Sequence, residues 1–393
     1  MLNEQYLQSL DWSLVINQLK TGHWKAMATY LDLHTTRDGH LDWMHPLSLA
    51  AKANAEDNPW WNEAMNGPNA EGFWDAMCKE VTTLTDQKDV WEVVLREVWM
   101  NVLPSTWAFK CKRFPDGLIK KLKARFCVRG DKQLEGVDFF ETFAPIVSRT
   151  TIRLMLILSL VLGLATRQVD YTAAFLHAPI DEDVYVKMPR GFAEPGKVLK
   201  LKKSLYGLKQ APRNFFQHLK GKLERIGFTS SSADPCLFIS EKVICIVYVD
   251  DTLLFSPRAE CIDEVLSQLK EEDLDLEEED DVAGVLGVNV QRDDANGQIL
   301  MTQQDLFDRI IDALGCNSLP GKRTPAEYGA LGSDKGGDPP QGTFSYASVI
   351  SMLQYLQAHT RPDITLAVSQ CARFIQLASP TSWRLYASDS ISS

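Results

Sequence analysis

The feature that most constrains the fold of this chain is an apolar run, residues 243–255, broken at its middle by Asp250 and Asp251. Strand-forming residues precede the acidic pair and a shorter apolar run follows it, which predicts a β-hairpin that turns at or near the two aspartates. Both faces of the first strand are apolar, so Asp250 begins on a face that should be dry. A buried carboxylate needs a partner. Taken alone, an Asp-Asp pair in a turn is more often simply solvated.

Composition narrows the class of protein. The chain has 393 residues, 45% of them hydrophobic and 24% charged, which is typical of a globular protein with two or three compact units. Its eight cysteines are scattered without a CxxC pair, which indicates reduced core thiols and no zinc site or disulfide frame. We see no signal peptide at the N-terminus, and the longest apolar run, residues 154–165, is too short to span a bilayer.

Charge is unevenly distributed along the chain. The net charge of −11 argues against a nucleic-acid partner, but residues 107–132 hold nine Lys or Arg against two Asp, and residues 197–225 hold nine against one Glu. Acidic residues gather elsewhere, at nine of the eleven positions 271–281. This segregation predicts a phosphate-binding channel on an acidic body, with solvated lysine faces as the alternative.

The N-terminal part shows one interpretable element. Residues 1–59 have some helical spacing but no assignable chemistry, and we treat them as a leader of unknown role. Residues 60–106 are rich in tryptophan, which more often forms core than binds nucleobases, and a helix is expected over 72–83. Residues 107–114 and 121–129 alternate apolar and basic side chains on either side of a Pro-Asp-Gly turn. They predict a β-hairpin with a basic face suited to phosphates.

The central part alternates helices and strands. We expect a buried helix over 152–165, then a short strand that ends at Asp170 and is followed by small residues. Pro212 suits the first turn of a helix that closes at Gly227, and the hairpin with the Asp pair is followed by another amphipathic helix and a strand. This β-α-β-β-α-β order is that of a ferredoxin-like sheet, in which Asp170 and the Asp pair can be neighbours.

The C-terminal part carries weaker signals. A second hairpin is expected over residues 285–301, around Asn296-Gly297, and the Gly/Pro-rich residues 316–343 predict a linker. Residues 344–377 have a helical pattern that is interrupted at Arg361-Pro362-Asp363.

Three neighbouring carboxylates imply bound cations. Two like charges about 4 Å apart repel by roughly 4 kcal/mol at an effective dielectric constant of 20, so three ionised carboxylates would not cluster alone. Mg²⁺ is held by one or two carboxylates together with phosphate oxygens, and two ions can stabilise the attacking and leaving oxygens of phosphoryl transfer. The site therefore suits a nucleoside triphosphate or a nucleic-acid 3′ end.

Several motifs together carry a family resemblance. DYTAAFLH (170–177), SLYGLKQAPR (204–213) and YVDD (248–251) resemble, in order and spacing, the polymerase motifs of copia-type LTR-retrotransposon reverse transcriptases. KAR (123–125), ETFAP (141–145) and TRPD (360–363) also look like signatures of that family, and the resemblance runs from about residue 61 to residue 380.

The resemblance implies an α+β right-hand polymerase with a ferredoxin-like palm built on an antiparallel sheet. Residues 60–165 would form the fingers, 166–315 the palm and primer-grip region, and 344–393 a truncated thumb or connection segment after the 316–343 linker. By position, the resemblance implies metal ligands, nucleotide contacts and a primer grip. The metal ligands, for two Mg²⁺ or Mn²⁺ ions, would be Asp170, Asp250, Asp251 and the backbone carbonyl of Tyr171; the dNTP contacts would be Lys123, Arg125, Phe175 as a steric gate, Gly207, Lys209 and Gln210; the primer grip would be Leu286 and Gly287. Tyr248 could equally be plain packing.

The resemblance also implies the reaction and its partners. We expect a nucleotidyltransferase, an RNA-directed DNA polymerase that uses an RNA template, a DNA primer and dNTPs. We expect it to act inside the cell, in cytoplasmic virus-like particles or the nucleus, without a membrane or secretion. The chain stops at Ser393 without the ribonuclease H domain that usually follows, and shows no protease, zinc-knuckle or integrase motif, which suggests a piece of a polyprotein. The alternative is a truncated relic that only binds nucleic acid; a nucleotide cyclase is disfavoured because it leaves the other motifs unexplained.

Overall fold

The structure is a computed structural model that describes residues 57–113, 118–279, 284–285, 287–316 and 345–375, with six single positions outside these ranges. Backbone contacts divide the described chain between residues 281 and 282 into two compact units. Each unit is described by itself. The expected leader and linker lie almost entirely outside the described residues.

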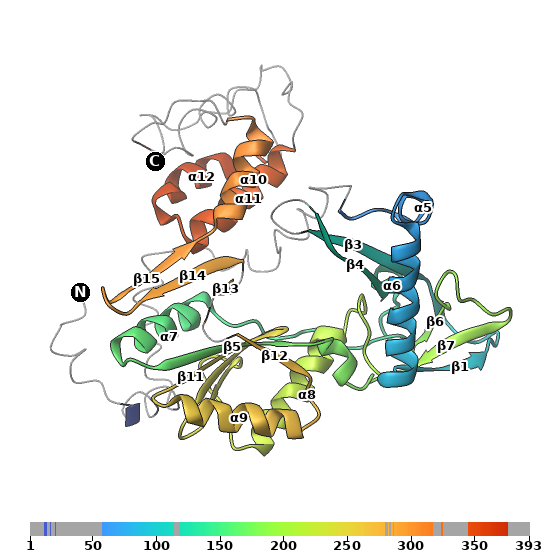
Figure 1. Ribbon diagram of the computed structural model, residues 1–393, viewed down its shortest axis with the longest axis horizontal. Coiled ribbons are helices and arrows are strands. Elements are labelled where there is room, and N and C mark those ends of the chain that lie inside the picture. Colours follow the sequence, from blue (N-terminus) through green and yellow to red (C-terminus); the bar gives the residue numbers. More distant parts are fainter. Residues whose placement is uncertain are drawn as a thin grey trace. The chain divides into compact units, whose positions relative to one another are not determined.

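The first unit is built on a six-stranded antiparallel sheet (Figure 1). Its strand order is β12-β5-β11-β10-β9-β8. The strands are β5 (Ala165–Tyr171), β8 (Thr229–Ser230), β9 (Leu237–Ile239), β10 (Ile244–Tyr248), β11 (Asp251–Ser256) and β12 (Leu276–Glu279).

Two helices complete the ferredoxin-like palm. Helix α8 (Ala211–Arg225) lies between β5 and the β10–β11 hairpin in sequence, and α9 (Ala259–Glu271) lies between β11 and β12. The chain order and the strand order together are those of the β-α-β-β-α-β fold, which confirms the predicted palm. The last strand of this fold, β12, lies in the acidic run at residues 271–281, where the sequence gave no strand signal.

Helix α7 (Arg149–Val161) precedes the palm sheet and differs from the expected range of 152–165. It begins earlier because the Ser148 side chain caps it, accepting a hydrogen bond from the Thr150 N–H. It ends earlier because Gly163 takes a left-handed conformation, with φ 61°. The expected C-terminal end was therefore wrong, since Ala165 already begins β5.

The rest of the first unit contains the predicted hairpin and helix. Strands β3 (Ser105–Arg113) and β4 (Ile119–Val128) pair antiparallel, as expected, around a turn outside the described residues. The helix predicted over 72–83 is α6 (Ala70–Thr82), which packs on β4. A second sheet has the order β1-β7-β6-β2, formed by β1 (Trp91–Leu95), β2 (Val102–Leu103), β6 (Tyr185–Val186) and β7 (Lys197–Leu201).

Some of the tryptophans expected in the core are buried, and others are exposed. Trp91 is buried as predicted, but Trp60 and Trp99 are exposed, at 76% and 65%. All eight cysteines are described; none of them forms a disulfide, and six of them are buried, which agrees with reduced core thiols. No helix in the described ranges is long and apolar enough to cross a membrane.

The second unit holds a small sheet and three helices. The hairpin expected around Asn296-Gly297 is confirmed as β14 and β15, and the expected interruption at Pro362 separates α11 from α12. Helices α10, α11 and α12 share one apolar core. The elements are β13 (Gly284–Val285), β14 (Val288–Asp293), β15 (Gln298–Thr302), α10 (Gln304–Leu314), α11 (Tyr346–His359) and α12 (Thr365–Ala372).

Candidate active site

The Asp pair lies at the tip of the β10–β11 hairpin. Tyr248 pairs with Asp251, so Val249 and Asp250 form the two-residue turn. Val249 takes the left-handed conformation, with φ 49°, where the sequence pattern had suggested an aspartate. This conformation is costly for a β-branched residue, and such strain is concentrated at functional sites.

Asp170 joins the pair from the neighbouring strand. In the register of β5 and β11, Asp170 lies directly opposite Asp251. The Tyr171 N–H donates to the Asp250 carbonyl at 3.2 Å, which ties the end of β5 to the hairpin turn. Side chains directly opposite on an antiparallel pair point to the same face, so the sheet brings the first carboxylate to the pair as predicted.

The three carboxylates destabilise one another's charge. Burial, with the charge of Asp170 second, raises the pKa of Asp250 and that of Asp251 to about 6. Burial also raises the pKa of Asp170, and Glu277, which lies opposite it on β12, adds to this. One oxygen of Asp250 is buried without a hydrogen-bond partner in the described part of the chain. Such a group is stabilised by a bound cation.

The donor set fits a divalent cation that also binds a substrate. Carboxylate oxygens are the ligands that Mg²⁺ prefers, and it completes its shell with waters and phosphate oxygens. In the described ranges, no three acidic, His or Cys side chains are arranged as a preformed metal site.

Cations of the β3–β4 hairpin face these carboxylates. Lys110 pairs with Lys123 and Lys112 with Lys121, so like charges lie directly opposite each other on one face, which is unfavourable without an anion. None of these lysines, nor Arg125, has an ion-pair partner among the described residues. Arg125, Lys123 and Lys112 all lower the pKa of Asp170. Burial and the neighbouring cations lower the pKa of Lys123 itself.

The second basic segment, residues 197–225, behaves differently. Seven of its nine cations form ion pairs with acidic side chains, so here the surface-charge alternative describes the structure better than a phosphate channel does. The seven are Lys197, Lys200, Lys202, Arg213, Lys220, Lys222 and Arg225.

The expected steric gate lies in an aromatic cluster. The Phe175 ring is half-buried and packs edge-on against Tyr206, with 5.3 Å between ring centroids. The Arg125 guanidinium lies 4.9 Å from the centroid of the same tyrosine ring. Tyr206 thus connects Phe175 to Arg125. Sequence reasoning assigned it no role, although it lies within the SLYGLKQAPR motif.

Gly207 is required by its close approach to β4. It has φ 91°, and a Cβ there would lie 2.1 Å from the Val128 carbonyl oxygen. The Tyr206 carbonyl accepts a hydrogen bond from the Val128 N–H at 2.8 Å. The segment therefore rests directly on the end of the cationic hairpin, and its glycine cannot be replaced without moving the backbone.

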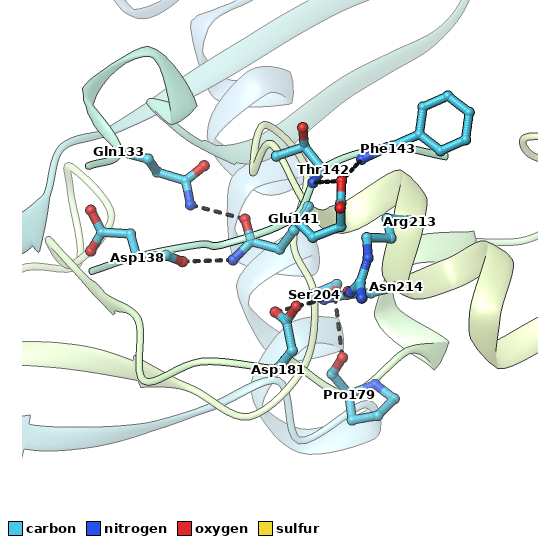
Figure 2. Close-up of polar contacts among 11 residues, drawn as sticks. Gln133, Asp138, Glu141, Thr142, Phe143, Pro179, Asp181, Ser204, Arg213 and Asn214 are labelled. Atoms are coloured by element: carbon cyan, nitrogen blue, oxygen red, sulfur yellow. Dashed lines mark hydrogen bonds and ion pairs between the residues drawn. The ribbon is translucent and has the colours of Figure 1, made fainter. Parts of the chain in front are cut away.

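Gln210 holds the neighbouring loop through Gln133 and Asp138, both labelled in Figure 2, and Lys209 contacts the same loop. Gln210 is fully buried; its Nε2 donates to the Asp138 carbonyl at 2.8 Å and its Oε1 accepts from Gln133 Nε2 at 2.9 Å. The Lys209 N–H donates to Gln133 Oε1 at 2.8 Å, and Lys209 Nζ lies 4.6 Å from the Phe139 ring centroid. The Gln210 side chain thus supports the loop, and its expected contact with the dNTP remains a prediction.

The primer-grip residues lie in the second unit. Gly287 has φ 66° and sits in the tight turn between β13 and β14. Leu286 lies outside the described residues. Their expected role remains a prediction.

Comparison with known proteins decides the family. The family model described as reverse transcriptase (RNA-dependent DNA polymerase) matches residues 88–328, which include all three carboxylates and the cationic hairpin. The chain belongs to this reverse transcriptase family. Reverse transcriptases generally depend on divalent metal ions. The resemblance to copia-type retrotransposon enzymes that the motifs indicated is thereby confirmed.

Individual relatives agree. This reverse transcriptase chain is 30% identical over 336 residues to the retrovirus-related Pol polyprotein from transposon TNT 1-94 of Nicotiana tabacum, covering 82% of the chain and 25% of the relative. It is 30% identical over 348 residues to that from transposon RE1 of Arabidopsis thaliana, covering 86% and 23%. The chain thus spans about a quarter of the length of these relatives. A solved foamy viral protease-reverse transcriptase in complex with double-stranded DNA is similar at a TM-score of 0.38 and 13% identity, over 72% of this chain and 40% of that one.

Proposed function

We propose that this chain is an RNA-directed DNA polymerase, which adds a deoxynucleotide to the 3′-OH of a DNA primer on an RNA template and releases pyrophosphate. The observation that carries the proposal is the register that sets Asp170 opposite Asp251 at the tip of the Asp250 hairpin. The cationic β3–β4 face that acts on Asp170 supports it. A site with anionic ligands on one side and unpaired cations on the other suits a metal-complexed triphosphate.

The carboxylates would hold the metal ions. Asp170, Asp250 and Asp251, with the backbone carbonyl of Tyr171, are the ligands we assign to two Mg²⁺ ions, which Mn²⁺ could replace. Bound there, the ions would supply charge stabilisation for the attacking 3′ oxygen and the leaving pyrophosphate oxygen. The protein's own contribution is a rigid antiparallel frame that keeps the three carboxylates on one face.

The cationic hairpin and the aromatic cluster would bind the nucleotide. Lys123 and Arg125 lack ion-pair partners among the described residues, so a triphosphate gains their charge without breaking an existing pair. Phe175 would exclude a ribose 2′-OH by its bulk. We assign the templating base to the surface beside Gly207 and Lys209, with Gln210 acting through the loop that it supports.

The remaining assignments extend this proposal. Leu286 and Gly287 would support the primer end, and an RNA template, a DNA primer and dNTPs would be the partners. The place of action we propose is the cytoplasmic virus-like particle, the nucleus or both. Cell fractionation with an antibody to the chain tests this, and recovery only from the culture medium would exclude it.

A relic that binds nucleic acid without polymerising is not favoured, because the matched family region keeps all three carboxylates and the cationic face. Primer extension on an RNA template with Mg²⁺, run beside a gel-shift assay, separates the two functions. We expect extension by the wild type, and both binding and no extension by Asp250→Asn. Binding without extension by the wild type would support the relic and refute the polymerase.

A further inference from the structure

The loop that carries Phe175 is closed on itself. Within residues 172–177, the Thr172 carbonyl lies 3.1 Å from His177 Nε2, and the Leu176 N–H donates to the Ala173 carbonyl at 2.9 Å. Ala173 takes a left-handed conformation, with φ 55°. A non-glycine residue adopts this conformation only where its surroundings hold it there. The loop therefore needs support from outside itself.

Asp275 supplies that support from the turn between α9 and β12. Its backbone carbonyl accepts a hydrogen bond from the Thr172 N–H at 2.9 Å. Its carboxylate forms an ion pair with Lys88 Nζ and lies 4.0 Å from His177 Nε2. Three segments that are far apart in sequence thus meet at one aspartate: the end of the π-helical turn at Lys88, the Phe175 loop, and the acidic run before β12.

The groups at this junction keep fixed roles. The His177 side chain is only 4% exposed, and burial lowers its pKa, so a neutral ring donating from Nε2 to the Thr172 carbonyl satisfies the contact. The hydrogen bond from Lys88 lowers the pKa of Asp275, which keeps this carboxylate ionised. Asp275 is 53% exposed, so an asparagine fits there without disturbing a core.

From these contacts we infer that Asp275 is a positioning residue for sugar discrimination. Its carboxylate pairs with Lys88, which fixes the backbone carbonyl that binds the Thr172 N–H. Thr172 in turn closes the loop through His177, and the loop sets the place of the Phe175 ring against Tyr206 and Phe215. Loosening the anchor lets the ring yield to a ribose 2′-OH, because a steric gate works only while its position is fixed. This inference rests on the proposed polymerase function and on the gate role of Phe175.

The test measures the ratio of kcat/KM for a dNTP to kcat/KM for the matching rNTP. Asp275→Asn removes the charge at the anchor and keeps the size of the side chain. Asp273→Asn is the matched control, since it removes an exposed charge from the same turn and asparagine tolerates the φ of 62° found there. We expect Asp275→Asn to lower the ratio roughly tenfold, within the range of coupling through packed segments. Asp273→Asn leaves the ratio unchanged.

A double-mutant cycle with Phe175→Ala shows whether Asp275 acts through the gate. Phe175→Ala alone lowers the ratio more than Asp275→Asn does, and adding Asp275→Asn to it causes no further fall. The inference is overturned if Asp275→Asn matches Asp273→Asn, if its full effect persists without Phe175, or if Phe175→Ala leaves the ratio unchanged. Absence of any dNTP incorporation by the wild type would instead refute the proposed function, and the inference with it.

Discussion

Asp170 and Asp251 are direct cross-strand neighbours on β5 and β11. Because Asp251 closes the hairpin turn that holds Asp250, one register brings three acidic residues to the same end of the sheet. Burial and mutual repulsion raise their pKa values. The site is therefore less stable without a cation than a neutral version of it would be, and this has measurable consequences.

Neutralising one of these carboxylates should stabilise the metal-free protein. The pKa of Asp251 rises from 3.8 when unfolded to about 6 when folded, so the folded state binds more protons between these values. The stabilisation that the protonated Asp251 carboxyl gives to the folded state is fully present below pH 3.8 and is lost as the pH rises through about 6. At about pH 7.5, Asp251→Asn should raise the free energy of unfolding by about 1–3 kcal/mol.

Urea unfolding in a chelator at about pH 4 and pH 7.5 measures this effect. Asp263→Asn, which removes an exposed charge on α9, is the control and should change little at either pH. A gain for Asp251→Asn that is as large at pH 4 as at pH 7.5 would contradict the assigned cause.

Mg²⁺ should stabilise the wild type more than the neutralised variants. A ligand that binds only the folded state raises stability by RT ln(1 + [L]/Kd), and removing a ligating carboxylate raises Kd. Calorimetry over a Mg²⁺ titration should show Tm rising for the wild type and hardly at all for Asp170→Asn. Equal shifts in both proteins would place the ion elsewhere.

Lys123→Ala should weaken dNTP binding more than it slows the chemical step. Its ammonium has no ion-pair partner among the described residues and acts on Asp170. We expect KM for dNTP to rise roughly tenfold, the size of a charge-assisted contact, with a smaller change in kcat. Lys220→Ala is the control because that lysine already pairs with Glu224 at 3.8 Å. If the control raises KM as much, a general loss of positive charge explains the effect.

Much of the palm could be predicted from the sequence, because its signals are local. The apolar runs beside Asp250, the amphipathic stripe of α8 and the small residues after Asp170 each mark an element, and their order specifies the ferredoxin-like sheet. Family motifs then indicated Lys123 and Arg125, whose positions are set by the local β3–β4 hairpin.

Other features depend on tertiary contacts that leave no local signal. Strand β12 is acidic and has poor strand propensity, yet its residues pair with β5, so that Glu277 lies opposite Asp170. Only the fold shows that the Gln210 amide is buried against Asp138 and Gln133. The inferred role of Asp275 likewise depends on its contacts with Lys88 and the Phe175 loop, which only the fold shows.

Gln210→Ala should therefore act through stability. It removes the buried amide that donates to the Asp138 carbonyl and leaves Gln133 Nε2 without its acceptor, for an expected loss of about 1–3 kcal/mol. Denaturant unfolding of Gln133→Ala, Gln210→Ala and the double variant should show non-additive losses. If Gln210→Ala instead raises KM for dNTP without changing stability, Gln210 contacts the nucleotide directly.

The central claim is that Asp170, Asp250 and Asp251 form a metal-dependent polymerising centre. Single-turnover incorporation of one dNTP into a DNA primer on an RNA template, with and without Mg²⁺, tests it most directly. The wild type should extend the primer only with the ion, and Asp251→Asn should bind the same primer–template with similar affinity but extend it at least about a hundredfold more slowly. Extension by Asp251→Asn at the wild-type rate, or by the wild type in a chelator, would contradict the account.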